Sequence, residues 1–201
     1  SNWVVVAGSS DFNFGTDDFT IECWIYRTGT SYGFVFETRG GADTNSTDGI
    51  GLYMGSGGNN EIGVAVTGSA VILINQDHQT NDQWQHFAVV REGSTMTLYI
   101  DGTARGTGSN STDFNRNRPF RLGNIHNATA NGGYGFPGYI DDFRVTKGLA
   151  RYTSNFTPSS AAHPTSEGIT ENKYIGQIGG IDDSDVDYGV EKLSNSQLMI
   201  K

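Results

Sequence analysis

The chain has 201 residues, enough for one sizeable β domain with a hydrophobic core of its own. Asp and Glu outnumber Lys and Arg by 22 to 13, and the net charge of −9 excludes general binding to nucleic acid or to anionic membranes. Aromatic residues make up 11% of the chain and stand in alternating runs, which excludes a disordered protein, and the 28 glycines favour an all-β fold rich in turns.

Six short strands are predicted in the first part of the chain, where β-branched and aromatic runs alternate with Gly, Ser, Asn and Asp. They cover residues 4–6, 19–27, 34–38, 49–54, 61–66 and 70–74. In the second strand Phe19, Ile21 and Cys23 share one face, while Trp24 and Tyr26 project from the other. We expect Cys23, the one cysteine of the chain, to be a small buried residue.

Residues 84–102 give the clearest local signal in the sequence. Two β-branched and aromatic runs are separated at 92–94 and closed at 101–102, and short loops with Gly between such runs predict β-hairpins. Three apolar residues fall on one face of the second run and are expected in the core: Met96, Leu98 and Ile100.

The later part of the chain predicts two further strands, at 120–123 and 139–145, and no helix beyond a turn near 148–152. The spacing of strands and turns favours a two-sheet sandwich. No apolar run approaches the roughly 18 residues that cross a bilayer, so no membrane insertion is expected.

Three blocks of sequence, in this order, carry a resemblance to a known family: residues 9–26, 84–102 and 136–158. They resemble the opening strand, the central meander and the closing strand of the laminin-G-like branch of the concanavalin A-like lectin/glucanase jelly rolls. The resemblance covers residues 1–160 and implies an all-β, two-sheet antiparallel jelly-roll sandwich. Residues 147–158 are similar to the version of this family that is common in bacteriophage structural proteins.

The composition changes after residue 160. Residues 165–201 hold seven acids and three lysines together with scattered apolar residues. This segment is too short for a core of its own and too apolar for a plain solvated linker. We therefore expect a sandwich at 1–160 and an acidic C-terminal arm or linker at 161–201, which lies along the sandwich or docks on a neighbouring subunit.

Catalysis is not expected from this chain. Glucanases with the resembled fold carry two catalytic acids that alternate along one strand, and a retaining pair needs carboxyl groups about 5 Å apart. Here Asp141 and Asp142 are adjacent, so a regular strand would point them to opposite faces, and Glu22 stands alone. His86 lies within a predicted strand and is expected to be a packed or edge residue rather than a catalytic one.

Calcium is the one metal that the sequence admits, and no cofactor is certain. Asp141 and Asp142 match the acidic pair that precedes the last strand in the resembled family, where such a pair either ligates calcium or holds the backbone. Residues 183–189 imitate the alternating acids of a calcium loop, but Gly189 comes one residue late for an EF-hand.

Four residues are candidates for sugar binding. Lectin sites combine aromatic faces with amide, carboxylate and backbone groups that bind hydroxyls. Residues 124–136 form a long polar loop that contains His126 and Tyr134, while Trp24 and Tyr26 could line the face of a sheet. The alternative for these aromatic residues is burial between the two sheets.

Together these observations favour a non-enzymatic surface module of a bacteriophage virion, which decorates a capsid or a tail. Its expected partners are other virion proteins or copies of itself, and cell-surface glycans as a ligand class, with no nucleic acid. The alternative is a secreted bacterial carbohydrate-binding or adhesion domain. The expected location is accordingly the virion surface or the extracellular space.

Overall fold

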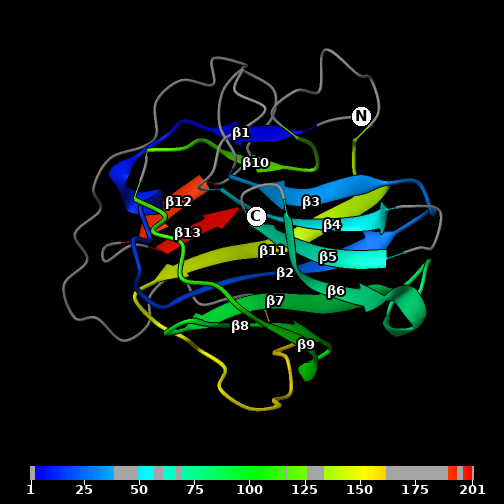
Figure 1. Cartoon of the computed structure of the whole chain (residues 1–201). Coiled ribbons are helices and arrows are strands. Elements are labelled where there is room, and N and C mark those ends of the chain that lie inside the picture. The colour runs from blue at the N-terminus through cyan, green and yellow to red at the C-terminus, as the bar shows by residue number, and fades with distance from the viewer. Residues whose placement is uncertain are drawn as a thin grey trace, which may run out of the picture.

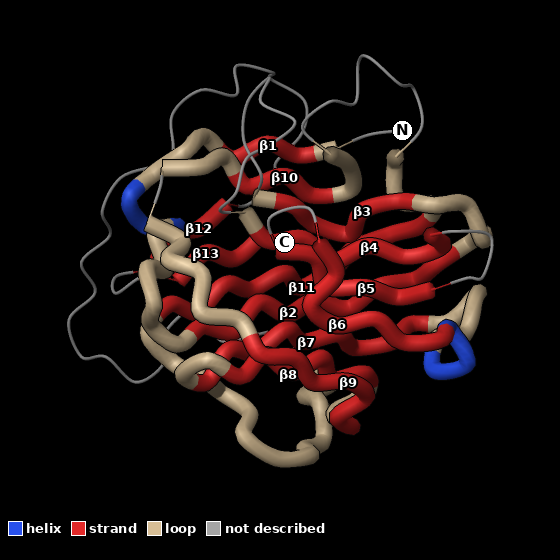
Figure 2. Tube along the Cα trace, viewed as in Figure 1, coloured by secondary structure: helices blue, strands red, loops and turns tan. Residues whose placement is uncertain are grey.

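Two antiparallel sheets stack face to face in the computed structural model, as Figure 1 shows. The structure describes residues 3–38, 49–56, 61–66, 69–115, 117–125, 134–161, 190–193 and 197–200. Strands dominate these residues, and the helices among them are two single 3-10 turns, η1 (Ser10–Phe12) and η2 (Gln76–His78) (Figure 2). The predicted all-β sandwich is confirmed. Neither 3-10 turn approaches the length and hydropathy of a membrane-crossing helix.

One sheet has six strands and the other has seven. The six-stranded sheet has the order β1 (Val4–Val6), β10 (Phe120–Leu122), β3 (Gly33–Glu37), β4 (Ile50–Ser56), β5 (Glu61–Val66), β6 (Ser69–Asn75). The seven-stranded sheet has the order β12 (Val190–Leu193), β13 (Gln197–Ile200), β11 (Gly138–Lys147), β2 (Phe19–Arg27), β7 (Trp84–Glu92), β8 (Thr95–Ile100), β9 (Thr103–Ser109). The predicted bounds agree with these strands to within two residues, and those of β1, β2 and β5 agree at both ends.

The core lies between the sheets and follows the alternation read from the sequence. Met96, Leu98 and Ile100 are buried there, as predicted, and the turn that precedes them is exposed at Gly93, where φ is +58°. Cys23 is buried in the same core, and burial raises the pKa of its thiol, which suits a packing residue rather than a nucleophile.

After β11 the chain crosses the outer face of the seven-stranded sheet as an extended segment, residues 149–158, which we call the strap (Figure 1, yellow to orange). Three strap residues pack on three sheet residues: Ala150, Tyr152 and Phe156 on Ala88, Val90 and Tyr99. The N–H of Phe156 donates to the carbonyl of Gly102 at 2.9 Å. A Cβ at position 102 would lie 1.8 Å from the carbonyl oxygen of Phe156, so only glycine lets the strap dock here.

The C-terminal segment contributes two strands to the same sheet. β12 pairs with β13, and β13 pairs antiparallel with β11, with Leu198 opposite Val145. In this chain the segment therefore adds to its own sandwich, which is one of the two expected arrangements. The other residues beyond 161 lie outside the described part, and the domain boundary at 160 stays a prediction.

Candidate functional site

A β-bulge in β11 sets the outer face of the seven-stranded sheet. The register of β11 against β2 shifts between Asp141 and Arg144, so two residues of β11 stand opposite Cys23 alone. Asp142 adopts a φ of +51°, and its N–H donates to the carboxylate of Asp141 at 2.8 Å. Because the bulge adds one residue to the strand, Asp141 and Arg144 lie on the same face despite their odd spacing.

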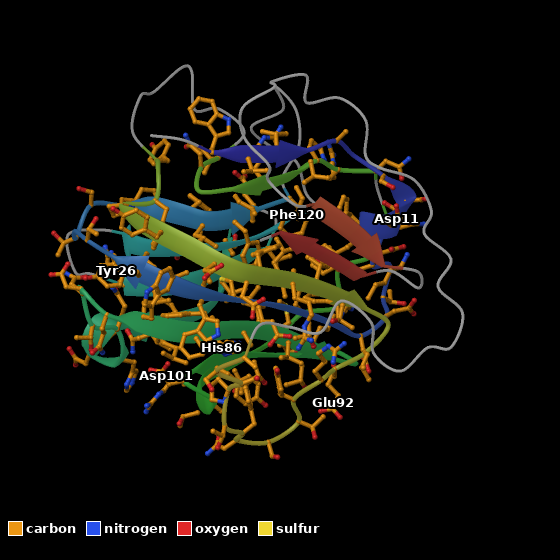
Figure 3. The ribbon with its side chains drawn as sticks, turned by 180° about the vertical axis from the view of Figure 1, so that it is seen from behind. Asp11, Tyr26, His86, Glu92, Asp101 and Phe120 are labelled. Atoms are coloured by element: carbon orange, nitrogen blue, oxygen red, sulfur yellow. The ribbon has the colours of Figure 1, made fainter. Side chains whose placement is uncertain are left out.

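Three aromatic residues form a row across neighbouring strands of this face. Tyr139 on β11 stands opposite Tyr26 on β2, and Tyr26 stands opposite Trp84 on β7. The ring centroids of Tyr139 and Tyr26 lie 6.0 Å apart, and those of Tyr26 and Trp84 lie 5.6 Å apart. Tyr139 is 64% exposed and Trp84 is 45% exposed. We call Tyr139, Tyr26 and Trp84 the aromatic row; Figure 3 views this face and labels Tyr26.

The outward-facing residues next to the aromatic row along the same three strands include an acid. Asp141 stands opposite Trp24, and Trp24 stands opposite His86, with a distance of 5.4 Å between the Trp24 and His86 ring centroids. Asp141 is exposed, and one of its carboxylate oxygens accepts the N–H of Asp142. Within the described residues its second oxygen has no hydrogen-bond donor, so this oxygen is available to a ligand hydroxyl.

A buried polar cluster follows beneath the strap. Glu22 is fully buried, and one of its carboxylate oxygens accepts from Arg144 Nε at 2.8 Å and Nη2 at 2.7 Å. Its other oxygen lies 3.2 Å from His86 Nε2 and accepts from the Tyr152 hydroxyl at 2.7 Å. Burial, and next the charge of Glu22, raise the pKa of Tyr152, which keeps its hydroxyl protonated as a donor. Glu22 is thus fully engaged, and His86 is packed, as predicted.

The predicted binding residues do not meet at one site. Trp24 and Tyr26 lie on the outer face of the seven-stranded sheet, whereas Tyr134 packs on the outer face of the six-stranded sheet, 5.2 Å from Tyr32 between ring centroids. His126 lies outside the described residues. Trp84 was not recognised from the sequence, because only strand register shows that it stands beside Tyr26.

The acidic pair takes part in the bulge, which is the backbone-holding role that the resemblance allowed. Among the residues that the structure describes, no group of three or more His, Cys, Asp or Glu is placed to hold a metal ion. Residues 183–189 are not among them. Calcium binding at Asp141 or Asp142 stays a prediction.

A family model described as the concanavalin A-like lectin/glucanases superfamily, of the laminin G type, matches residues 1–150. The chain belongs to this superfamily. The match spans every strand from β1 to β11, so the family that the sequence resembled is confirmed. A search of curated proteins found no significant match.

Solved structures share the concanavalin A-like fold at low sequence identity. A Bacteroides ovatus protein named "putative carbohydrate binding protein" has a TM-score of 0.55 and 18% identity, over 76% of this chain and 43% of its own. Domains LG4-5 of the mouse laminin α1 chain have a TM-score of 0.52 and 17% identity, over 72% of this chain and 38% of their own. Tailspike protein 2 of an Escherichia coli O157:H7 bacteriophage has a TM-score of 0.52 and 14% identity, over 73% of this chain and 21% of its own. The chain thus spans less than half of each, and at these identities the likeness concerns the fold.

Proposed function

We propose that this chain is a non-enzymatic glycan-binding module displayed on the surface of a bacteriophage virion, on its capsid or its tail. The aromatic row on the seven-stranded sheet is the binding surface, and Trp24 and Asp141 extend it. Cell-surface glycans are the ligands, and other virion proteins or copies of the chain are its partners in the particle.

The exposure of the aromatic row carries this proposal. Burying a large aromatic side chain is favourable, yet Tyr139 and Trp84 stay about half exposed or more on a rigid sheet. Aromatic rings bind the apolar C–H faces of sugars, and a site built on paired strands holds its rings in place before the ligand arrives. A row of exposed rings beside a carboxylate therefore indicates a surface that binds a sugar.

The acids on this face support binding without catalysis. Glycoside hydrolysis needs two carboxyl groups on either side of the scissile bond, roughly 5 Å apart for retention and roughly 6.5–9.5 Å apart for inversion. Glu22, the acid that β2 places on this face, is buried and bonded to Arg144, His86 and Tyr152. In this proposal Asp141 binds sugar hydroxyls, and one carboxylate does not supply both catalytic roles.

The virion setting rests on the strap sequence, which resembles bacteriophage structural proteins, and on the tailspike that shares the fold. The alternative, a secreted bacterial carbohydrate-binding or adhesion domain, is favoured by the Bacteroides ovatus protein. Mass spectrometry separates the two. Recovery of the chain in purified particles supports the virion module, and its recovery only from particle-free culture medium supports the secreted domain.

A glycan array followed by isothermal titration tests binding by the full chain. Trp84→Ala and Tyr26→Ala should each weaken the affinity at least tenfold, about 1.4 kcal/mol, because each removes a stacking surface. Trp3→Ala is the matched control, since Trp3 is 48% exposed beside β1 of the other sheet. The proposal is wrong if the array shows no glycan, or if Trp3→Ala weakens binding as much as Trp84→Ala.

A further inference from the structure

We infer that the aromatic row takes an uncharged, non-planar glycan chain and that Asp141 determines this specificity. The inference rests on the proposed function and deepens it by naming the class of ligand. Three features carry it: the position of Asp141, the engagement of the neighbouring arginines, and the tilt between the rings.

Asp141 lies where it can reach a sugar that is stacked on the row. It stands directly opposite Trp24 and two residues from Tyr139 on the same face of β11, roughly 7 Å along the strand. The N–H of Asp142 fixes one carboxylate oxygen at 2.8 Å, so the side chain is held by the bulge rather than free to rotate. The second oxygen accepts hydrogen bonds only, which matches the hydroxyl donors of a neutral sugar.

The arginines close to this acid in the chain do not offset its charge. Arg144 faces outward from the same strand, but its guanidinium already makes two contacts with Glu22. Arg151 of the strap donates to the hydroxyl of Thr146, which stands opposite Thr20. Thr20 and Tyr26 are six residues apart on β2, so Thr146 lies roughly 20 Å from the row. The surface beside the row is therefore anionic, as is the whole chain at −9. A sugar carboxylate or sulfate would meet repulsion here.

The row also indicates the shape of the ligand. One ring comes from each of three adjacent strands, so a chain that contacts all three crosses the strands rather than following one. Its centroid spacings of 6.0 Å and 5.6 Å are similar to the length of one pyranose unit. The ring planes are inclined by 59° and 63° to their neighbours, so the three rings cannot lie together on a flat crystalline surface. A soluble chain whose successive units turn fits this arrangement.

Matched sugar pairs test the inference on the full chain. The probes are β-1,4-linked mannohexaose and the β-1,4-linked mannuronate hexamer, which differ at C6, and cellohexaose with its glucuronate counterpart. Crystalline cellulose powder tests for a flat ligand, and all titrations use low salt because screening weakens charge effects. The neutral member of whichever pair is bound should bind at least tenfold more tightly, and cellulose powder should retain no protein.

Asp141→Asn keeps an oxygen that accepts the N–H of Asp142 while it removes the charge. This variant should lower the ratio of neutral to anionic affinity at least fivefold. Asp113→Asn changes the net charge equally at an exposed position elsewhere and should leave the ratio unchanged.

Two failures are distinguishable. If Trp84→Ala abolishes binding but the wild-type chain prefers uronates, or Asp141→Asn leaves the ratio unchanged, the glycan site stands and the specificity inference is overturned. If neither neutral nor anionic sugars bind, on these probes or on an array, the proposed function itself falls, and the inference with it.

Discussion

The outer face of the seven-stranded sheet has two aromatic halves that differ in what covers them. Over β7 and β8 the strap lies on the sheet, and Tyr152 stacks on Phe156 with centroids 3.5 Å apart and planes 5° from parallel. Over β11, β2 and the start of β7, Tyr139 and Trp84 flank Tyr26 with tilted rings and no described segment packed above them. We call these the covered half and the open half.

The comparison shows that aromatic content alone does not mark a binding surface. Both halves are rich in aromatic residues, but in the covered half the chain itself supplies the partner, and Tyr99 is buried beneath it. The open half has the same type of residue without that partner. His86 marks the boundary, because its ring centroid lies 5.7 Å from that of Phe156 in the strap and 5.4 Å from that of Trp24. Mutations on the two sides should accordingly separate stability from binding.

The largest effect is expected at the buried acid between the halves. Glu22→Ala should lower the free energy of unfolding by about 3–5 kcal/mol, because it leaves the Arg144 guanidinium and His86 buried without their carboxylate. Urea denaturation followed by tryptophan fluorescence measures this. Glu92→Ala removes an exposed acid at the end of β7 and is the control. A loss below about 1 kcal/mol for Glu22→Ala would show that the cluster does not hold the strap.

The next effect concerns the strap itself. Phe156→Ala should cost about 3 kcal/mol, the low end for an aromatic truncation, because the side chain is only half-buried although it stacks on Tyr152 and contacts His86 and Tyr99. Leu149→Ala, at a strap residue that is 48% exposed, should change stability little. Equal losses in the two variants would show that the stacked aromatic contacts do not hold the strap on the covered half.

A smaller effect should appear as a dependence of stability on pH. Because the pKa of Tyr152 is raised in the folded protein, its contribution is present below the ordinary tyrosine pKa of about 10 and is lost as the pH rises above it. Tyr152→Phe should cost about 1.5–2 kcal/mol at pH 7, since it removes a hydrogen bond to a charged group. Urea titrations from pH 8 to pH 11 should show a shallower decline in this variant than in the wild type. An unchanged decline would assign the dependence to other groups.

The sequence predicted the fold through local patterns, and the site only in part. In β2 a strict alternation of apolar residues fixes both ends of the strand and places Trp24 and Tyr26 on the outer face. The row could not be predicted, because Tyr139 and Trp84 join Tyr26 only through the register of three strands far apart in the chain. The resemblance to the family allowed a backbone-holding role for the acidic pair, but the position of the bulge and the left-handed φ of Asp142 do not follow from the strand pattern.

The covered half was equally hidden from the sequence, which predicted only a turn near 148–152. Its docking depends on contacts between residues about fifty positions apart, such as the N–H of Phe156 with the carbonyl of Gly102. Tyr134, a candidate binding residue, packs near Tyr32, Phe34 and Tyr53 on the other sheet, and its role in binding stays a prediction. The local pattern predicts the face of a strand from which a side chain projects. Whether another segment then packs over that side chain depends on the folded chain.

The smallest change in stability is expected at Tyr139 in the aromatic row, where we expect a large change in glycan binding. Tyr139→Ala should alter the free energy of unfolding by no more than about 0.5 kcal/mol, because a side chain that is 64% exposed already leaves most of its surface in water. The same variant should weaken glycan binding at least tenfold, because the ring is free to stack on a sugar. Tyr99→Ala, in the covered half, is the matched comparison and should cost several kcal/mol with the strap above it. If Tyr139→Ala instead destabilised the chain by more than about 1 kcal/mol, the row would be a packing surface like its covered neighbour, and its exposure would no longer point to a ligand.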